Sequence, residues 1–95
     1  MGRLLVSVNI FAETAEIDGV ISALQKFDNV EEVYEVTGEY DIVTLVSAKT
    51  LEEFRDLLNK QILKIHGVKS TISTIILYPH KGRRCPKNAP IKSTV

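Results

Sequence analysis

The stretch VEEVYEVTGEYDIVTLVSA, residues 30–48, decides the fold because it has the pattern of two strands joined by a tight turn. Residues 30–37 alternate between apolar and polar side chains, and residues 41–48 are too apolar for either face to lie in water. The link of residues 38–40 is so short that the two strands must pair antiparallel, as a hairpin. One face of the first strand is expected to carry Val30, Tyr34 and Val36.

The segment before the hairpin predicts one strand and one helix. Residues 4–11 carry apolar side chains at both odd and even positions, which is typical of a strand covered on both faces. Thr14 can cap a helix, and the apolar residues from Ala15 to Phe27 follow helical spacing. We therefore expect a strand over residues 4–11 and a helix over residues 15–27.

The segment after the hairpin predicts a second helix and a last strand. Thr50 and Glu53 have the spacing of a capping box, in which the Thr50 hydroxyl accepts from the Glu53 amide and the Glu53 carboxylate reaches back. The apolar stripe that follows extends the helix to about Ile65, and Gly67 can end it in a left-handed conformation. Residues 68–78 then form the fourth strand.

The order strand, helix, strand, strand, helix, strand predicts a ferredoxin-like α+β fold. Right-handed crossovers place both helices of this βαββαβ order on one face of a four-stranded antiparallel sheet. The opposite face stays apolar, which is unusual for a monomer, so we expect a second copy to pack its sheet there as a dimeric α+β barrel. That face is expected to carry Leu5, Phe11, Val43, Leu45, Ile75 and Leu77, or the complementary set under another register.

Charge divides the 95-residue chain into a domain of residues 1–79 and a basic tail of residues 80–95. The tail carries five basic residues and no acidic one, whereas the domain carries seven basic and twelve acidic residues. An acidic domain is a poor surface for nucleic acid, which needs clustered Lys and Arg. The tail could contact an acidic partner or RNA, but the plainer expectation is a solvated, partly disordered extension.

The sequence favours a cytoplasmic protein without a metal or other cofactor. It shows neither a signal peptide nor a run of about 18 apolar residues, so no membrane association is expected. The single cysteine, Cys85, cannot form an internal disulfide. His66 is expected to lie at a helix end as a capping residue, and the spacing of His66, His80 and Cys85 matches no usual zinc site.

Three motifs together resemble the effector-binding half of the Lrp/AsnC, or feast/famine, regulators. They are VTGEYDIV at residues 36–43, TLEEF at residues 50–54 and IHGVKSTIST at residues 65–74. In that family a Thr-Gly-x-Tyr-Asp hairpin and a final strand beginning Gly-Val-x-x-Thr-x-Thr recur in the same order. The resemblance covers residues 3–78. Ser73 stands where the family often has Thr, and His66 where it commonly has Pro.

The resemblance implies a stand-alone ligand-binding module. The full regulators carry a helix-turn-helix domain before this half, and a first strand that starts near Arg3 leaves no room for one. Such modules occur in prokaryotes, archaea in particular, although an excised domain would look the same. The implied partners are a second copy, an octamer of four dimers and full-length Lrp/AsnC regulators, with no direct DNA binding.

The resemblance also implies a site for a small molecule, with an α-amino acid expected. Its ligand residues would be Gly38, Tyr40, Asp41, Thr71 and Ser73. Asp41 would accept from the ammonium group, amides exposed at Gly38 would bind the carboxylate, and the two hydroxyls would add hydrogen bonds.

Each of these residues also has a purely structural interpretation. Gly38 suits any hairpin, Asp41 can cap a turn, Tyr40 can be a packing ring, and Thr71 and Ser73 are ordinary strand residues. Two other functions stay open. One is a small dimeric enzyme of monooxygenase type, for which no activated nucleophile stands out, and the other is a purely structural assembly partner.

Overall fold

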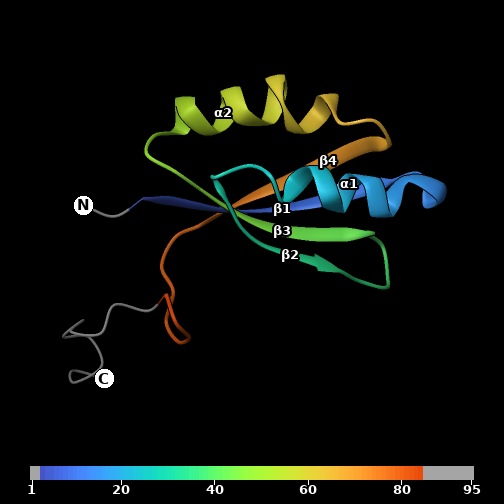
Figure 1. Cartoon of the computed structure of the whole chain (residues 1–95). Helices are drawn as coiled ribbons and strands as arrows, with labels where there is room; N and C mark the ends of the chain where they lie inside the picture. Colours follow the sequence, from blue (N-terminus) through green and yellow to red (C-terminus); the bar gives the residue numbers. More distant parts are fainter. Residues whose placement is uncertain (1–2, 85–95) are drawn as a thin grey trace, which may run out of the picture.

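The computed structural model describes residues 3–84 and has the predicted order of elements (Figure 1). The strands are β1 (Leu4–Ala12), β2 (Val30–Glu35), β3 (Ile42–Ala48) and β4 (Val68–Ile76). The helices are α1 (Ile17–Leu24) and α2 (Leu51–Lys60). Two short 3-10 turns flank them, η1 (Thr14–Glu16) before α1 and η2 (Ile62–Lys64) after α2.

The four strands form one antiparallel sheet in the order β2-β3-β1-β4, and both helices cover the same face of it (Figure 1). The central pair is β1 and β3, with Val6 opposite Val46 and Ile10 opposite Ile42. The ferredoxin-like α+β fold predicted from the order of elements is therefore confirmed. None of the helices within residues 3–84 is long and apolar enough to cross a membrane.

The core lies between the helices and the sheet, and the even-numbered residues of β1 and β3 form its floor. The helix layer contributes two residues of α1, two of α2 and one of η2, which are Val20, Leu24, Phe54, Leu57 and Ile62. Thr44 is the polar exception on the floor: it is fully buried, and its hydroxyl donates to the Glu32 carbonyl at 2.8 Å. This bond satisfies the hydroxyl and fastens β2 to β3.

The first helix is shorter than predicted. Thr14 lies inside the 3-10 turn η1 and caps nothing, and α1 begins only at Ile17 and ends at Leu24. The Glu13 amide donates to the Gly67 carbonyl at 2.8 Å, which ties the chain before η1 to the loop before β4. The prediction of a helix over residues 15–27 with a Thr14 cap was therefore wrong at both ends: a 3-10 turn precedes α1, and after Leu24 the amides of Lys26 and Phe27 donate to carbonyls three residues back.

The start of the second helix follows the prediction more closely. The Glu53 amide donates to the Thr50 hydroxyl at 3.0 Å, and the Glu53 carboxylate reaches back to the Lys49 amide at 2.6 Å, one residue beyond its usual partner. The α-helix ends at Lys60, before the predicted Ile65, because a 3-10 turn takes over. Gly67 has the predicted left-handed conformation, with φ 103°.

A bulge in β2 changes which side chains face the core. The register shifts between Val30 and Glu32, so Val30 pairs with Val46 while Glu32 pairs with Leu45. Val30 therefore faces the helices and Tyr34 faces the other way. The prediction that the two share a face was wrong, because the extra residue reverses the alternation.

The sheet face without helices, called the open face below, is apolar as predicted. Leu5 lies opposite Ile76 and Asn9 opposite Ile72, which places two of the three isoleucines of β4 on this face. Ile75 lies opposite Val6 and so faces the helices, contrary to the expected set. Leu77 follows the end of β4 and is 93% exposed. The open face thus carries Leu5, Phe11, Val43, Leu45, Ile72 and Ile76.

Candidate ligand-binding site

The turn between β2 and β3 is closed by its own backbone. The Val36 amide donates to the Asp41 carbonyl at 3.1 Å, and Gly38 has φ 123°, a conformation that other residues rarely adopt. A Cβ atom added at Gly38 would meet nothing within 4 Å. The glycine is therefore required by the turn, and it leaves open space where a ligand could approach the backbone.

Asp41 anchors this turn to the end of β1. Its amide donates to the Ile10 carbonyl at 3.0 Å, and its Oδ2 accepts from the Ala12 amide at 2.8 Å. Ala12 is 3% exposed and follows a register shift after Phe11, so Asp41 supplies the acceptor for a buried amide at an irregular point of β1. Asp41 thus fills a structural role with one oxygen of its carboxylate, and the second oxygen can still accept hydrogen bonds.

Tyr40 lies on the open side of the sheet. Its ring packs against Phe11 with the two ring centroids 5.0 Å apart and the planes tilted by 55°. This geometry is a favourable aromatic contact, and it fixes the ring beside the anchored turn.

Thr71 and Ser73 share a face, as their spacing predicts, but it is the face that the helices cover. Thr71 lies opposite Ile10 and Ser73 opposite Val8 on the edge strand β4. Ser73 is nevertheless exposed, and Thr71 is half-buried. Asp41 and Thr71 flank β1 from its two sides, about 10 Å apart at two strand spacings. Within one chain the two hydroxyls do not meet the turn, and Tyr40 lies on the other face.

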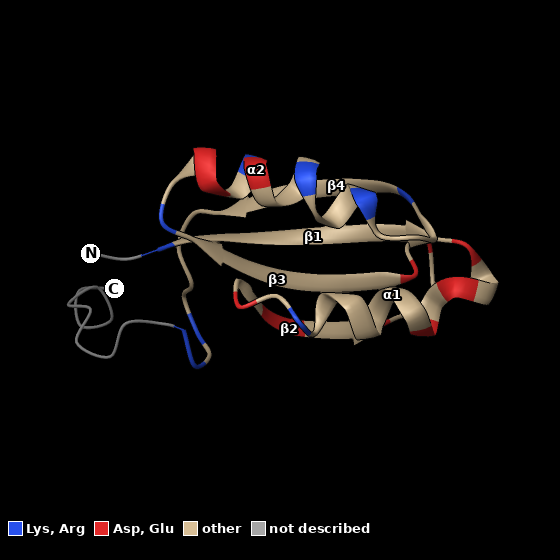
Figure 2. Ribbon diagram, turned by 45° about the horizontal axis from the view of Figure 1, so that its top comes forward, with Lys and Arg blue, Asp and Glu red and all other residues tan. Residues whose placement is uncertain are grey.

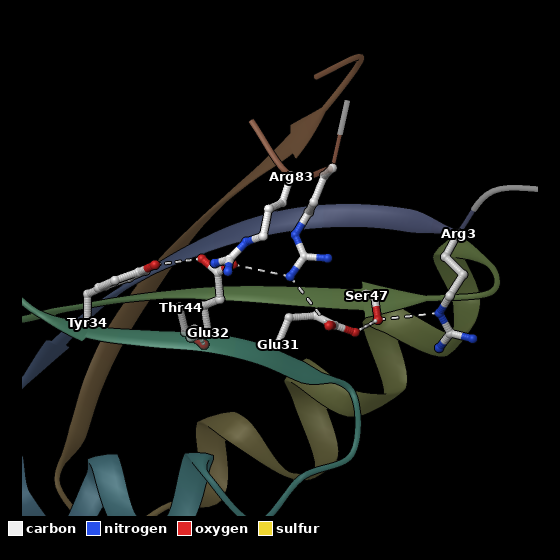
Figure 3. A network of polar contacts seen from close by, with 8 residues as sticks. Arg3, Glu31, Glu32, Tyr34, Thr44, Ser47 and Arg83 are labelled. Atoms are coloured by element: carbon white, nitrogen blue, oxygen red, sulfur yellow. Dashed lines mark hydrogen bonds and ion pairs between the residues drawn. The ribbon is translucent and has the colours of Figure 1, made fainter. Parts of the chain in front are cut away.

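A polar network that the sequence analysis missed crosses the open face near the start of β2 (Figure 3). The Tyr34 hydroxyl donates to Glu32 at 2.7 Å, and the Ser47 hydroxyl donates to Glu31 at 2.7 Å. The Arg84 guanidinium reaches both carboxylates, at 3.4 Å from Glu31 and 3.2 Å from Glu32. The hydrogen bond from Tyr34 and then Arg84 lower the pKa of Glu32 below 4.5, while Glu32 raises the pKa of Tyr34 above 10.0.

A groove of about 840 Å³ lies between this network and the segment after β4, with Arg3, Leu5, Ile76 and Arg83 among its lining residues. The arginines of the tail come to lie beside the acidic strand β2 (Figure 2). The described part of the tail is exposed, but Arg83 and Arg84 pair with the domain, and Cys85 lies outside the described residues. Opposite charges on tail and domain were the only sequence signal for this contact.

The histidines do not form a metal centre with other described residues. His66 Nε2 lies 3.4 Å from Glu16 Oε2, so it pairs with η1 rather than capping a helix, contrary to expectation. The His80 ring stacks edge-on against Tyr78, with centroids 5.2 Å apart. Across residues 3–84 no three His, Cys, Asp or Glu side chains gather closely enough to hold a metal ion.

A four-stranded antiparallel sheet with two helices on one face defines a small α+β module. Residues 5–85 match the family model of the Lrp/AsnC ligand binding domain, and the chain belongs to this family. The predicted family resemblance is thereby confirmed.

The individual relatives are transcription regulators and structures of the same fold. The HTH-type transcriptional regulator FL11 of Pyrococcus furiosus is 35% identical over 79 residues, which are 83% of this chain and 52% of FL11. A crystal structure of a Thermus thermophilus protein is 30% identical with a TM-score of 0.77, covering 83% of this chain and 99% of that one. A feast or famine regulatory protein from M. tuberculosis, complexed with L-methionine, is 32% identical with a TM-score of 0.73. The match covers 85% of this chain and 54% of that one.

The chain spans about half the length of the curated regulators that it matches. The part that matches is described by the ligand binding domain model, and these relatives are transcription regulators.

Proposed function

We propose that the chain binds a free α-amino acid, or a small molecule of similar chemistry, beside the turn of residues 38–41. The family match and the L-methionine held by the M. tuberculosis relative support this ligand class. The binding would change how copies of the chain assemble, and the assembly would modulate Lrp/AsnC-type transcription regulators in the cytoplasm. Because transcription would be affected through such a partner, the chain itself needs neither a catalytic group nor direct contact with DNA.

The observation that carries the proposal is the way Asp41 is held. Its Oδ2 is fixed by the buried Ala12 amide, so the carboxylate keeps one orientation beside the open space at Gly38. A fixed carboxylate next to accessible backbone amides offers an acceptor for an ammonium group and donors for a carboxylate. These are the two charged groups that every free α-amino acid presents.

The rest of the site is proposed to come from neighbouring copies. Thr71 and Ser73 lie about two strand spacings from Asp41, too far for one amino acid to bridge all three in a single chain. We propose a dimer through the apolar open face and an octamer of four dimers, in which Thr71 and Ser73 of one copy face the turn of another. In this arrangement residues 1–79 form the ligand-binding domain, and residues 80–95 are a basic tail whose Arg83 and Arg84 pair with it.

Thermal unfolding in the presence of each common L-amino acid tests the proposal. A ligand at about 100 times its dissociation constant adds roughly 2.7 kcal/mol, which for a domain of this size raises the midpoint on the order of 10 °C. The matched control is the N-acetyl form of each active amino acid, which lacks the ammonium group and is expected to give no shift. A flat panel would contradict the ligand class, and an equal shift with the N-acetyl form would contradict the role of Asp41.

A further inference from the structure

After β4 ends, the chain runs beyond the end of the sheet (Figure 1). Residues 77–84, here called the strap, turn back on the side of the open face (Figure 1). Pro79, Lys81 and Arg83 of the strap border the same hollow as Leu5 and Leu45 of the open face. The strap therefore stands across a hollow from apolar residues that would otherwise face a partner sheet.

One arginine closes the strap against the sheet. Arg84 Nη2 lies 3.4 Å from Glu31 Oε1 and 3.2 Å from Glu32 Oε2, a set of contacts called the Arg84 clasp below. Arg83 adds a longer contact to Glu32 at 3.9 Å. The arginine is attracted to two carboxylates at once, which is stronger than one surface ion pair.

Hydrogen bonds from residues of the sheet orient both carboxylates of the clasp. The Tyr34 hydroxyl holds Glu32, and the Ser47 hydroxyl holds Glu31 (Figure 3). The two neighbouring glutamates can receive one guanidinium because the bulge between Val30 and Glu32 breaks the alternation of β2. The side chain of Arg84 is only 35% exposed, so salt screens the clasp less than it would a fully exposed pair.

We infer that the strap is a built-in competitor of dimerisation through the open face, and that the Arg84 clasp sets how strongly it competes. Packed sheets lie about 10 Å apart, and the strap borders the space in front of Leu5 and Leu45 that a partner sheet would enter. A second copy can cover this end of the face only when the strap has moved away. The inference rests on the dimer in the proposed function, but not on the identity of the ligand.

Two consequences can be measured. Removing the clasp favours the open strap, so the dimer should form more readily. Because exposed and partly exposed ion pairs are individually weak, we expect the dimer dissociation constant to fall only about three- to tenfold. Added salt should also tighten the wild-type dimer, because it screens the clasp while it strengthens apolar contact.

Sedimentation equilibrium of the full chain over a range of concentrations tests the inference with four proteins. Arg84→Gln removes the guanidinium of the clasp. Glu32→Gln removes one of its two carboxylates but keeps an acceptor for the Tyr34 hydroxyl. Arg55→Gln is the matched control, because Arg55 is an exposed residue of α2 and its loss changes the net charge by the same amount. The wild-type chain completes the set.

We expect a three- to tenfold lower dissociation constant for Arg84→Gln and a smaller decrease for Glu32→Gln, with Arg55→Gln unchanged. The effect of salt should be smaller in Arg84→Gln than in the wild type. An unchanged or higher dissociation constant in Arg84→Gln would overturn the inference. If all four proteins stay monomeric at every concentration, the inference falls together with the proposed dimer, while the amino-acid panel still decides the ligand separately.

Discussion

Replacing Asp41 separates its structural role from its proposed role in binding. In the Asp41→Ala variant the Ala12 amide, which is almost fully buried, loses its acceptor. An unsatisfied buried amide costs about 1–3 kcal/mol. A loss of ligand binding in this variant alone would therefore say little, because the turn itself would be disturbed.

The Asp41→Asn variant keeps an oxygen for the Ala12 amide and removes only the charge. We expect it to unfold at a free energy within about 1 kcal/mol of the wild type, since a neutral acceptor replaces a charged one. Its affinity for an ammonium group should fall much further. A charge-assisted hydrogen bond is about twice as strong as a neutral one, so we expect roughly tenfold weaker binding.

Urea unfolding and isothermal titration with the amino acid that stabilises the wild type measure these two effects. Glu39→Gln is the matched control, since Glu39 is an exposed acid of the same turn and its replacement removes the same charge. Unchanged affinity in Asp41→Asn would refute the assignment of the ammonium site. An equal loss in Glu39→Gln would show that only the overall charge of the turn matters.

Two further predictions concern stability. In urea unfolding, Gly67→Ala should destabilise the domain by more than Gly38→Ala. Both glycines have positive φ, but a Cβ at Gly67 would collide with the Glu16 Cβ, whereas a Cβ at Gly38 would meet no atom within 4 Å. Equal losses would show that backbone strain alone decides. Glu53→Gln should lower the free energy of unfolding near neutral pH, because hydrogen bonds from the Lys49 amide and then the Asn29 side chain hold the pKa of Glu53 below 4.5. The extra stability of the wild type is present above that value and is lost as the pH falls through the folded-state pKa. A difference in stability between the two proteins that does not change with pH would contradict the prediction.

The parts of the fold that the sequence predicts are those set by neighbouring residues. The hairpin follows from two apolar runs and a glycine turn, and the start of α2 follows from Thr50 and Glu53, whose bonds are made within four residues. The way the chain enters η1 and α1 could not be predicted, because the bond from Glu13 to Gly67 joins distant segments. Local periodicity has no information about such a contact.

The same limit explains what the sequence missed on the open face. The bulge in β2 depends on its pairing with β3 alone, and a single extra residue places Val30 and Tyr34 on opposite faces of the sheet. The Arg84 clasp joins residues 52 and 53 positions apart, so only the charge imbalance pointed to it. The candidate ligand residues were recognised by motif, and the position of Asp41 beside Ala12 emerged only from the structure.

The sheet has two edges, and they differ in how readily a strand of another chain could pair with them. The edge at β2 combines a bulge with several glutamates, which are features that discourage another strand from adding to it. The edge at β4 carries the uncharged segment TISTIIL at residues 71–77, with Ile72 and Ile75 exposed. Such segments are typical of aggregating sequences. Precipitation of this protein, when it occurs, should therefore begin at β4, and a lysine introduced at exposed Thr74 should slow it.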